Sequence, residues 1–210
     1  VWYHRRDDDD RRVKTWDWPE APSLLEEAYN FEDALFVAGL MNEFIRRSDR
    51  VRIACIAQLV NVIAPIRADT GGPAWRQTIY YPYQFASLFG RGVALNLAVD
   101  APTYDCRVAD DVSYLDAAGV LDNDGKIVTL FLLNRHLTEG ADLNVSLEGF
   151  AGAKVIEHIS MEGYDLQDTN TATDMDRVVP GKGSGLAVED GKLRGKIAPL
   201  SYHVVRLDVS

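Results

Sequence analysis

The sequence has few cysteines, no long hydrophobic run and fewer basic than acidic residues. Two cysteines in 210 residues, Cys55 and Cys106, are too few for a disulfide framework, so we expect two reduced thiols and a reducing compartment. Every apolar run is interrupted before the ~18 residues that a membrane-spanning helix needs. The net charge of -10 disfavours nucleic acid, anionic membranes and polyanionic substrates as partners. A neutral substrate such as a sugar is compatible with this charge.

Motifs for metals, nucleotides and a nucleophilic serine are also missing. The four histidines show no metal-ligand spacing, and the cysteines complete no zinc pattern. The sequence contains no phosphate-binding loop, dinucleotide fingerprint or nucleophile elbow. The acidic run at 7–10 lacks the alternation of a calcium loop, so it is interpreted as a solvated loop. No cofactor or metal is therefore predicted, and His158 and His203 are interpreted as ordinary outward or hydrogen-bonded side chains.

Up to residue 91 the pattern is typical of a parallel α/β architecture. Asn30 and Asp33 have the spacing of a capping box, and apolar residues then recur at helical spacing as far as Ile45. Residues 51–57 are almost purely apolar, which predicts a buried strand that contains Cys55. A Gly-Gly-Pro breaker and a second helix over 83–89 follow.

This α/β segment is too short to close a barrel alone. Residues 1–3 have the pattern of the later part of a strand, and the sequence shows no initiator Met or signal-peptide pattern at its start. We therefore expect the chain to be a piece of a larger protein, with the missing strands upstream.

Two neutral amides, Gln58 and Asn61, interrupt the apolar run over 52–66, and Gln58 directly follows the predicted strand at 51–57. Polar residues at the C-terminal ends of barrel strands hold ligands, and a buried amide without partners costs on the order of 1–3 kcal/mol. Gln58 is therefore a candidate binding residue. The alternative, that Gln58 and Asn61 only tie down a strand-to-loop turn, has equal weight on these residues alone.

After residue 91 the hydrophobic period changes from helical to two. Leu143, Val145 and Leu147 alternate with polar residues, and Asp-Gly turns occur at 124–125 and 190–191. Residues 127–133 are apolar on both faces, which predicts a central strand. The polar stretch 165–185 is predicted to be a long loop. Short alternating strands with regular turns indicate an antiparallel β-sandwich over 92–210.

Several motifs of the first half resemble one known family. Residues 1–4 (VWYH) resemble the end of the motif D-E-W-N-V-W-Y-H. Residues 29–35 (YNFEDAL), 56–66 (IAQLVNVIAPI) and 70–82 (TGGPAWRQTIYYP) resemble segments of the same family, glycoside hydrolase family 51, the α-L-arabinofuranosidases. The resemblance is dense up to residue 83 and mainly architectural through the sandwich, and the loop at 7–10 departs from it.

The resemblance implies a fold and an activity. The fold would be α/β plus all-β: the C-terminal remnant of a (β/α)8 TIM barrel over 1–91 and a jelly-roll-like β-sandwich over 92–210. The activity would be retaining hydrolysis of terminal α-L-arabinofuranosyl residues from arabinan, arabinoxylan or arabino-oligosaccharides. Both catalytic glutamates would lie outside this chain, the nucleophile three residues before Val1. Gln58 matches a sugar-contacting glutamine of the family, and Trp2 would lie at the rim beside the nucleophile strand, so both are predicted to bind substrate.

The resemblance also implies partners and a location. The N-terminal remainder of the protein would complete the barrel, the protein would be a homo-oligomer, hexameric as in this family, and it would be cytoplasmic. Two other interpretations stay open. One is a non-catalytic β-sandwich module for carbohydrate binding or assembly, against which the half barrel argues. The other is a hydrolase of the same family that acts on β-glucan, since loops upstream would determine backbone specificity.

Overall fold

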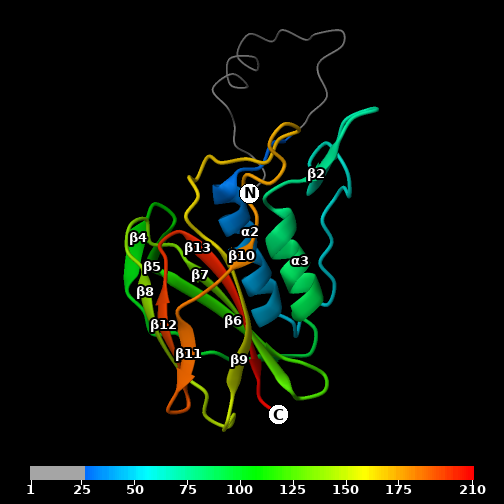
Figure 1. Ribbon diagram of the computed structural model, residues 1–210. Coiled ribbons are helices and arrows are strands. Elements are labelled where there is room, and N and C mark those ends of the chain that lie inside the picture. Colours follow the sequence, from blue (N-terminus) through cyan, green and yellow to red (C-terminus); the bar gives the residue numbers. More distant parts are fainter. Residues whose placement is uncertain (1–26) are drawn as a thin grey trace.

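The computed structural model describes residues 27–210, in which two helices lie beside an antiparallel β-sandwich (Figure 1). The helices are α2 (Phe31–Arg46) and α3 (Tyr80–Phe89). The strands are β1 (Ile66–Ala68), β2 (Ala74–Arg76), β3 (Val93–Leu95), β4 (Thr103–Cys106), β5 (Ala109–Ser113), β6 (Leu115–Leu121), β7 (Ile127–Asn134), β8 (Ala141–Ser146), β9 (Lys154–Met161), β10 (Gly181–Lys182), β11 (Leu186–Glu189), β12 (Lys192–Ile197) and β13 (Ser201–Asp208). Neither described helix is long and apolar enough to cross a membrane.

The predicted antiparallel sandwich is confirmed. A six-stranded sheet has the order β10-β9-β13-β7-β6-β3, and a three-stranded sheet has the order β11-β12-β8. The hairpins β1–β2 and β4–β5 stand apart from both sheets. Asp190 and Gly191, with φ of 50° and 71°, form the turn between β11 and β12. Positive φ at two successive turn residues matches the right-handed twist of the strands, which is why Asp-Gly predicts a hairpin here.

Strand β7 explains why residues 127–133 are apolar on both faces. It pairs with β13 on one side and β6 on the other, so the predicted central strand is confirmed. Phe131 and Leu133 point to a core layer shared with the helices, whereas Leu130 and Leu132 point to a second layer beneath the three-stranded sheet. Each face of the large sheet is therefore covered by a different element.

The helices share the first of these layers with the strands. Phe31, Leu35 and Phe85 of the helices pack in one buried cluster with Phe131 and Val204 of the sheet. Figure 1 shows α2 and α3 side by side against the same face of this sheet. The expected α/β segment and the sandwich are thus joined by a continuous hydrophobic core.

Helix α2 begins as its sequence predicts. The Asn30 side chain accepts a hydrogen bond from the Asp33 amide at 3.0 Å, and the Asp33 carboxylate accepts one from the Asn30 amide at 3.0 Å. This reciprocal capping box satisfies two amides that would otherwise lack partners. Helix α3 begins at Tyr80, three residues before its predicted start at 83, and it has no side-chain cap.

The predicted buried strand at 51–57 is wrong for the described residues. The segment is extended without sheet pairing, Ile53 is 82% exposed, and Cys55 is also exposed. A strand exists only where neighbouring backbone offers hydrogen bonds. No described strand lies against these residues, so the apolar pattern has no sheet to join. The predicted loop at 165–185 is mostly irregular, with the short strand β10 inside it.

Candidate functional site

Gln58 lies between the extended segment 51–57 and the hairpin β1–β2. Its side chain is exposed, and it makes no hydrogen bond within the described residues. An amide can donate to one group and accept from another, so Gln58 is able to bind hydroxyl groups of a ligand. Trp2, the other predicted binding residue, lies outside the described residues, so the structure does not place it relative to Gln58.

Asn61 has a different environment from Gln58. Its amide oxygen accepts from the Ala68 backbone at 2.7 Å, and its amide nitrogen donates to the Ala68 carbonyl at 3.1 Å. Its φ of 63° is the left-handed conformation that Asn tolerates better than most residues. Asn61 therefore ties the turn to strand β1, as the alternative interpretation of the two amides expects. Gln58 has no such partner, so that interpretation explains only Asn61.

Buried amides fix the hairpin that follows Gln58. The Gln77 side chain, 2% exposed, donates to the Ala64 carbonyl at 2.7 Å and accepts from the Tyr29 amide at 3.1 Å. The Tyr29 hydroxyl donates to the Ile63 carbonyl at 2.9 Å. Burial raises the pKa of Tyr29 to about 12, with the charges of nearby acidic residues adding to the effect, so the hydroxyl stays protonated and keeps donating. Three hydrogen bonds among Tyr29, Gln77 and residues 63–64 thus hold the chain just after Gln58.

Asn170 anchors the same hairpin from the long loop. Its side chain donates to the Arg76 carbonyl at 2.9 Å, and its backbone carbonyl accepts from the Trp75 indole at 3.1 Å. The sequence analysis did not identify Gln77 or Asn170. Nothing in their spacing distinguishes them from exposed amides, because their partners are 48 and 95 residues away.

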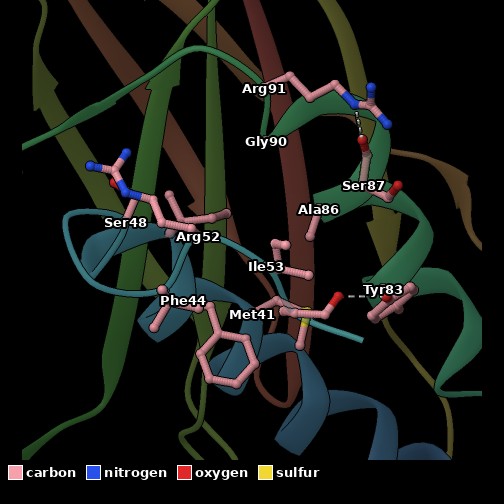
Figure 2. A pocket seen from close by; sticks show the side chains of 13 residues that line it. Met41, Phe44, Ser48, Arg52, Ile53, Tyr83, Ala86, Ser87, Gly90 and Arg91 are labelled. Carbon is pink, nitrogen blue, oxygen red and sulfur yellow. Dashed lines mark hydrogen bonds between the residues drawn. The ribbon is translucent and has the colours of Figure 1, made fainter. Parts of the chain in front are cut away.

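A pocket of about 280 Å³ lies at the other end of the extended segment, between the C-terminal halves of the two helices (Figure 2). Met41, Phe44 and Ile53 form apolar walls, and the Tyr83 hydroxyl donates to the Ala54 carbonyl at 2.9 Å. None of its 13 lining residues is Asp or Glu. The pocket therefore lacks the paired carboxylates of glycoside hydrolysis, and residues 51–54 form one of its walls.

Two buried histidines lie side by side on β9 and β13, where the sequence predicted ordinary side chains. His158 Nε2 and His203 Nδ1 are 3.0 Å apart, and His203 Nε2 is 2.9 Å from the Ser201 hydroxyl. Because Ser201 donates to the Ala198 carbonyl, it accepts from His203, and His203 Nδ1 then accepts from His158. Burial lowers the pKa of both histidines, that of His203 to about 3, with His158 adding to the effect. The pair is thus neutral and structural.

Comparison with known proteins identifies the family. The family model described as "Alpha-L-arabinofuranosidase C-terminal domain" matches residues 1–201. The intracellular exo-α-(1→5)-L-arabinofuranosidase of Halalkalibacterium halodurans is 44% identical over 207 residues, which are 99% of this chain and 40% of that protein. Intracellular exo-α-(1→5)-L-arabinofuranosidase 1 of Bacillus subtilis is 42% identical with the same coverage.

A solved structure agrees with these relatives. A family 51 α-L-arabinofuranosidase from Bifidobacterium longum superimposes with a TM-score of 0.84 and 31% identity, over 96% of this chain and 40% of that one. The chain thus spans about 40% of the length of the relatives it matches. By sequence and by fold, the chain belongs to the α-L-arabinofuranosidase C-terminal domain family, within glycoside hydrolase family 51.

Proposed function

We propose that this chain is the C-terminal part of a retaining, exo-acting α-L-arabinofuranosidase. The observation that carries the proposal is the identity of 42–44% to two enzymes of that name over 99% of the chain. Both are named for α-(1→5) linkages, so arabinan and its oligosaccharides are the proposed substrates, ahead of arabinoxylan. Both are also named intracellular, which supports a cytoplasmic enzyme.

The exposed apolar residues beside Gln58 support a barrel completed by the N-terminal remainder of the protein. Ile53 is 82% exposed, Leu59 71% and Val60 43%. Large apolar patches on a protein surface mark interaction sites. Neighbouring barrel strands would bury these side chains and give residues 51–57 the sheet partners that a strand needs. Residues 1–91 would then be the end of the barrel, and 92–210 the sandwich.

Gln58 and Trp2 would bind the sugar in this enzyme without performing the chemistry. One carboxylate attacks the anomeric carbon while a second protonates the leaving oxygen, and the two stand roughly 5–5.5 Å apart in retaining enzymes. Both carboxylates would lie outside this chain. Gln58 has no ionisable group, so its contribution is a hydrogen bond that orients a furanose hydroxyl or the nucleophile. The enzyme would assemble as a homo-oligomer.

Substrate choice and stereochemistry test the proposal together. The full-length protein is incubated with α-1,5-linked arabino-oligosaccharides and, separately, with β-glucan, and the released sugar is followed by proton NMR. We expect L-arabinose to appear first as the α-anomer, since two inversions retain configuration. Release of the β-anomer first, or hydrolysis of β-glucan alone, would refute the proposal.

A further inference from the structure

Three consecutive backbone carbonyls shortly after Gln58 are held by only two residues. The carbonyls belong to residues 63–65, and each accepts one hydrogen bond. The Tyr29 hydroxyl donates to the first at 2.9 Å, the Gln77 side chain to the second at 2.7 Å and the Gln77 backbone amide to the third at 2.8 Å. Gln77 therefore fixes two successive peptide groups of this segment by itself.

The turn that joins Gln58 to residues 63–65 is tied to the same segment through its backbone. The Asn61 carbonyl accepts from the Ala64 amide at 3.0 Å, and the Asn61 amide donates to the Ile66 carbonyl at 2.8 Å. A displacement of residues 63–65 would thus move Asn61, which is three positions after Gln58. The direction in which the chain presents Gln58 depends on this turn.

The chain ahead of Gln58 offers weaker support. Residues 51–57 have no sheet pairing within 27–210, and Ile53 is 82% exposed. The Tyr83 hydroxyl donates to the Ala54 carbonyl at 2.9 Å, four positions before Gln58. The hydrogen bonds that follow Gln58 are denser than those that precede it, so they carry more of its orientation.

Gln77 also connects the segment after Gln58 to both helices. Its side-chain oxygen accepts from the Tyr29 amide at 3.1 Å, just ahead of α2, and its backbone carbonyl accepts from the Tyr80 amide at 3.0 Å, where α3 begins. The side chain is 2% exposed, so water does not compete for these bonds. An amide suits this position because it donates at one end and accepts at the other without carrying a charge.

We propose that Gln77 is a positioning residue for substrate binding, which holds Gln58 in the orientation that binds the sugar. The inference rests on the proposed function, in which Gln58 contacts a furanose hydroxyl. Gln77 would act through the backbone of residues 61–65. Hydrogen bonds weaken steeply when their angle is poor, and small misplacements of binding groups lower the rate. A change at Gln77 should therefore be felt at Gln58.

Gln77→Glu in the full-length protein makes this link titratable. A protonated glutamate has the shape of glutamine, so it can donate to the Ala64 carbonyl and accept from the Tyr29 amide. An ionised one has no proton to donate and faces that carbonyl with a charge. Burial raises the pKa of a carboxyl group, so the protonated form dominates at pH 5 and ionisation increases towards pH 9.

The readout is kcat/KM on an aryl α-L-arabinofuranoside, divided by the wild-type value at the same pH. For Gln77→Glu we expect a ratio near one at pH 5 and a fall of about tenfold by pH 9, as a misplaced binding group would cause. Gln77→Asn is one methylene shorter and cannot span Tyr29 and Ala64, so it should lose about tenfold at every pH. It tests the link even where the glutamate stays protonated.

A double variant shows whether Gln77 acts through Gln58. In a Gln58→Ala background, Gln77→Asn should lower kcat/KM by no more than about twofold, because both changes remove the same interaction. Asn134→Asp is the matched control, since Asn134 is 1% exposed and donates to the carbonyls of Glu139 and Ala198 at 3.0 and 2.8 Å. It should lower the melting temperature but leave KM unchanged.

The possible outcomes separate this inference from the proposed function. Additive losses in the double variant, or an unchanged kcat/KM in both Gln77 variants, would overturn the inference alone. Wild-type protein that does not hydrolyse the arabinofuranoside would overturn the proposed function together with it. Circular dichroism at each pH measures the folded fraction, and KM is compared separately because a smaller folded fraction lowers kcat only.

Discussion

Gln58 and Asn61 interrupt the same apolar run, but only Asn61 uses its side chain within the described structure. Asn61 satisfies both backbone groups of Ala68, so it is fully occupied as a turn residue. Gln58 is exposed and lies three positions before this anchor in the sequence. A binding residue needs an amide that is free to bind and a backbone held in place nearby, and Asn61 supplies the second of these beside Gln58.

Replacing Gln58 by Ala should separate binding from folding. We expect Gln58→Ala to lower kcat/KM on an arabinofuranoside roughly tenfold to a hundredfold, as one lost hydrogen bond worth on the order of 1–3 kcal/mol would do. The melting temperature should stay near wild type, since the side chain holds nothing in the fold. Asn61→Ala serves as the control and should lower stability instead. Full activity in Gln58→Ala would make this amide structural.

The buried pair of His158 and His203 predicts how stability depends on pH. Burial lowers both pKa values in the folded protein, to about 3 for His203, whereas an unfolded histidine titrates near 6.5. Between these values the unfolded chain binds more protons, so stability falls as the pH falls below about 6.5 and is insensitive to this pair above it. At pH 5 the loss from His203 alone is about 2 kcal/mol.

Urea unfolding of the full-length protein at pH 8 and pH 5 measures this loss. The comparison with His203→Gln isolates the histidine, since the variant should show a smaller difference between the two pH values. An equal difference in the variant and the wild type would show that other groups cause the acid sensitivity.

At the scale of elements, the start of α2 depends on hydrogen bonds between residues that are close in the sequence. The capping box joins four atoms of Asn30 and Asp33, which are only three positions apart, so the sequence alone predicts it. Asn30→Ala should lower the free energy of unfolding by about 1 kcal/mol, as measured by chemical denaturation. Asn30→Asp keeps an accepting oxygen and should cost much less. Equal losses in the two variants would show that the cap is unimportant.

A hydrophobic pattern predicted a helix or strand correctly where the residues that bury the element belong to the described part of the chain. Strand β7 was predicted correctly because both of its apolar faces pack against core layers within this chain. The Asp190-Gly191 turn was predicted correctly because it depends only on the positive φ of these two residues. The run at 51–57 carries an equally strong apolar signal but forms no strand here. Under the proposed function, this pattern would describe burial in a barrel that the described residues do not contain, so periodicity alone could not reveal the state of 51–57 in this chain.

At the scale of the whole molecule, exposed apolar residues should make the 210-residue chain associate when it is expressed alone. Ile53 and Leu59 are the main contributors, at 82% and 71% exposure. Light scattering should show aggregates, and Ile53→Asn with Leu59→Asn should raise the soluble fraction several-fold. Val108→Asn, equally exposed but in the turn between β4 and β5, should not. A monomeric chain that hydrolyses arabinofuranosides unaided would contradict this prediction.

The candidate site was only partly predictable for a physical reason. Gln58 has a local signal, a polar residue that ends an apolar run. Gln77, Asn170 and the histidine pair depend on partners 45 to 95 residues away, so their burial appears only after folding.

The core that α2 and α3 share with the large sheet bears on how such enzymes can be recombined. A crossover between two relatives at residue 91 would combine Phe31 and Phe85 of one parent with Phe131 and Val204 of the other, although all four belong to one packed layer. Close-packed layers tolerate such mismatches poorly. Chimeric genes joined ahead of Asn30 would inherit this layer intact from one parent. The unit that can be exchanged without mixing this layer is therefore larger than the sandwich, and its boundary lies ahead of α2.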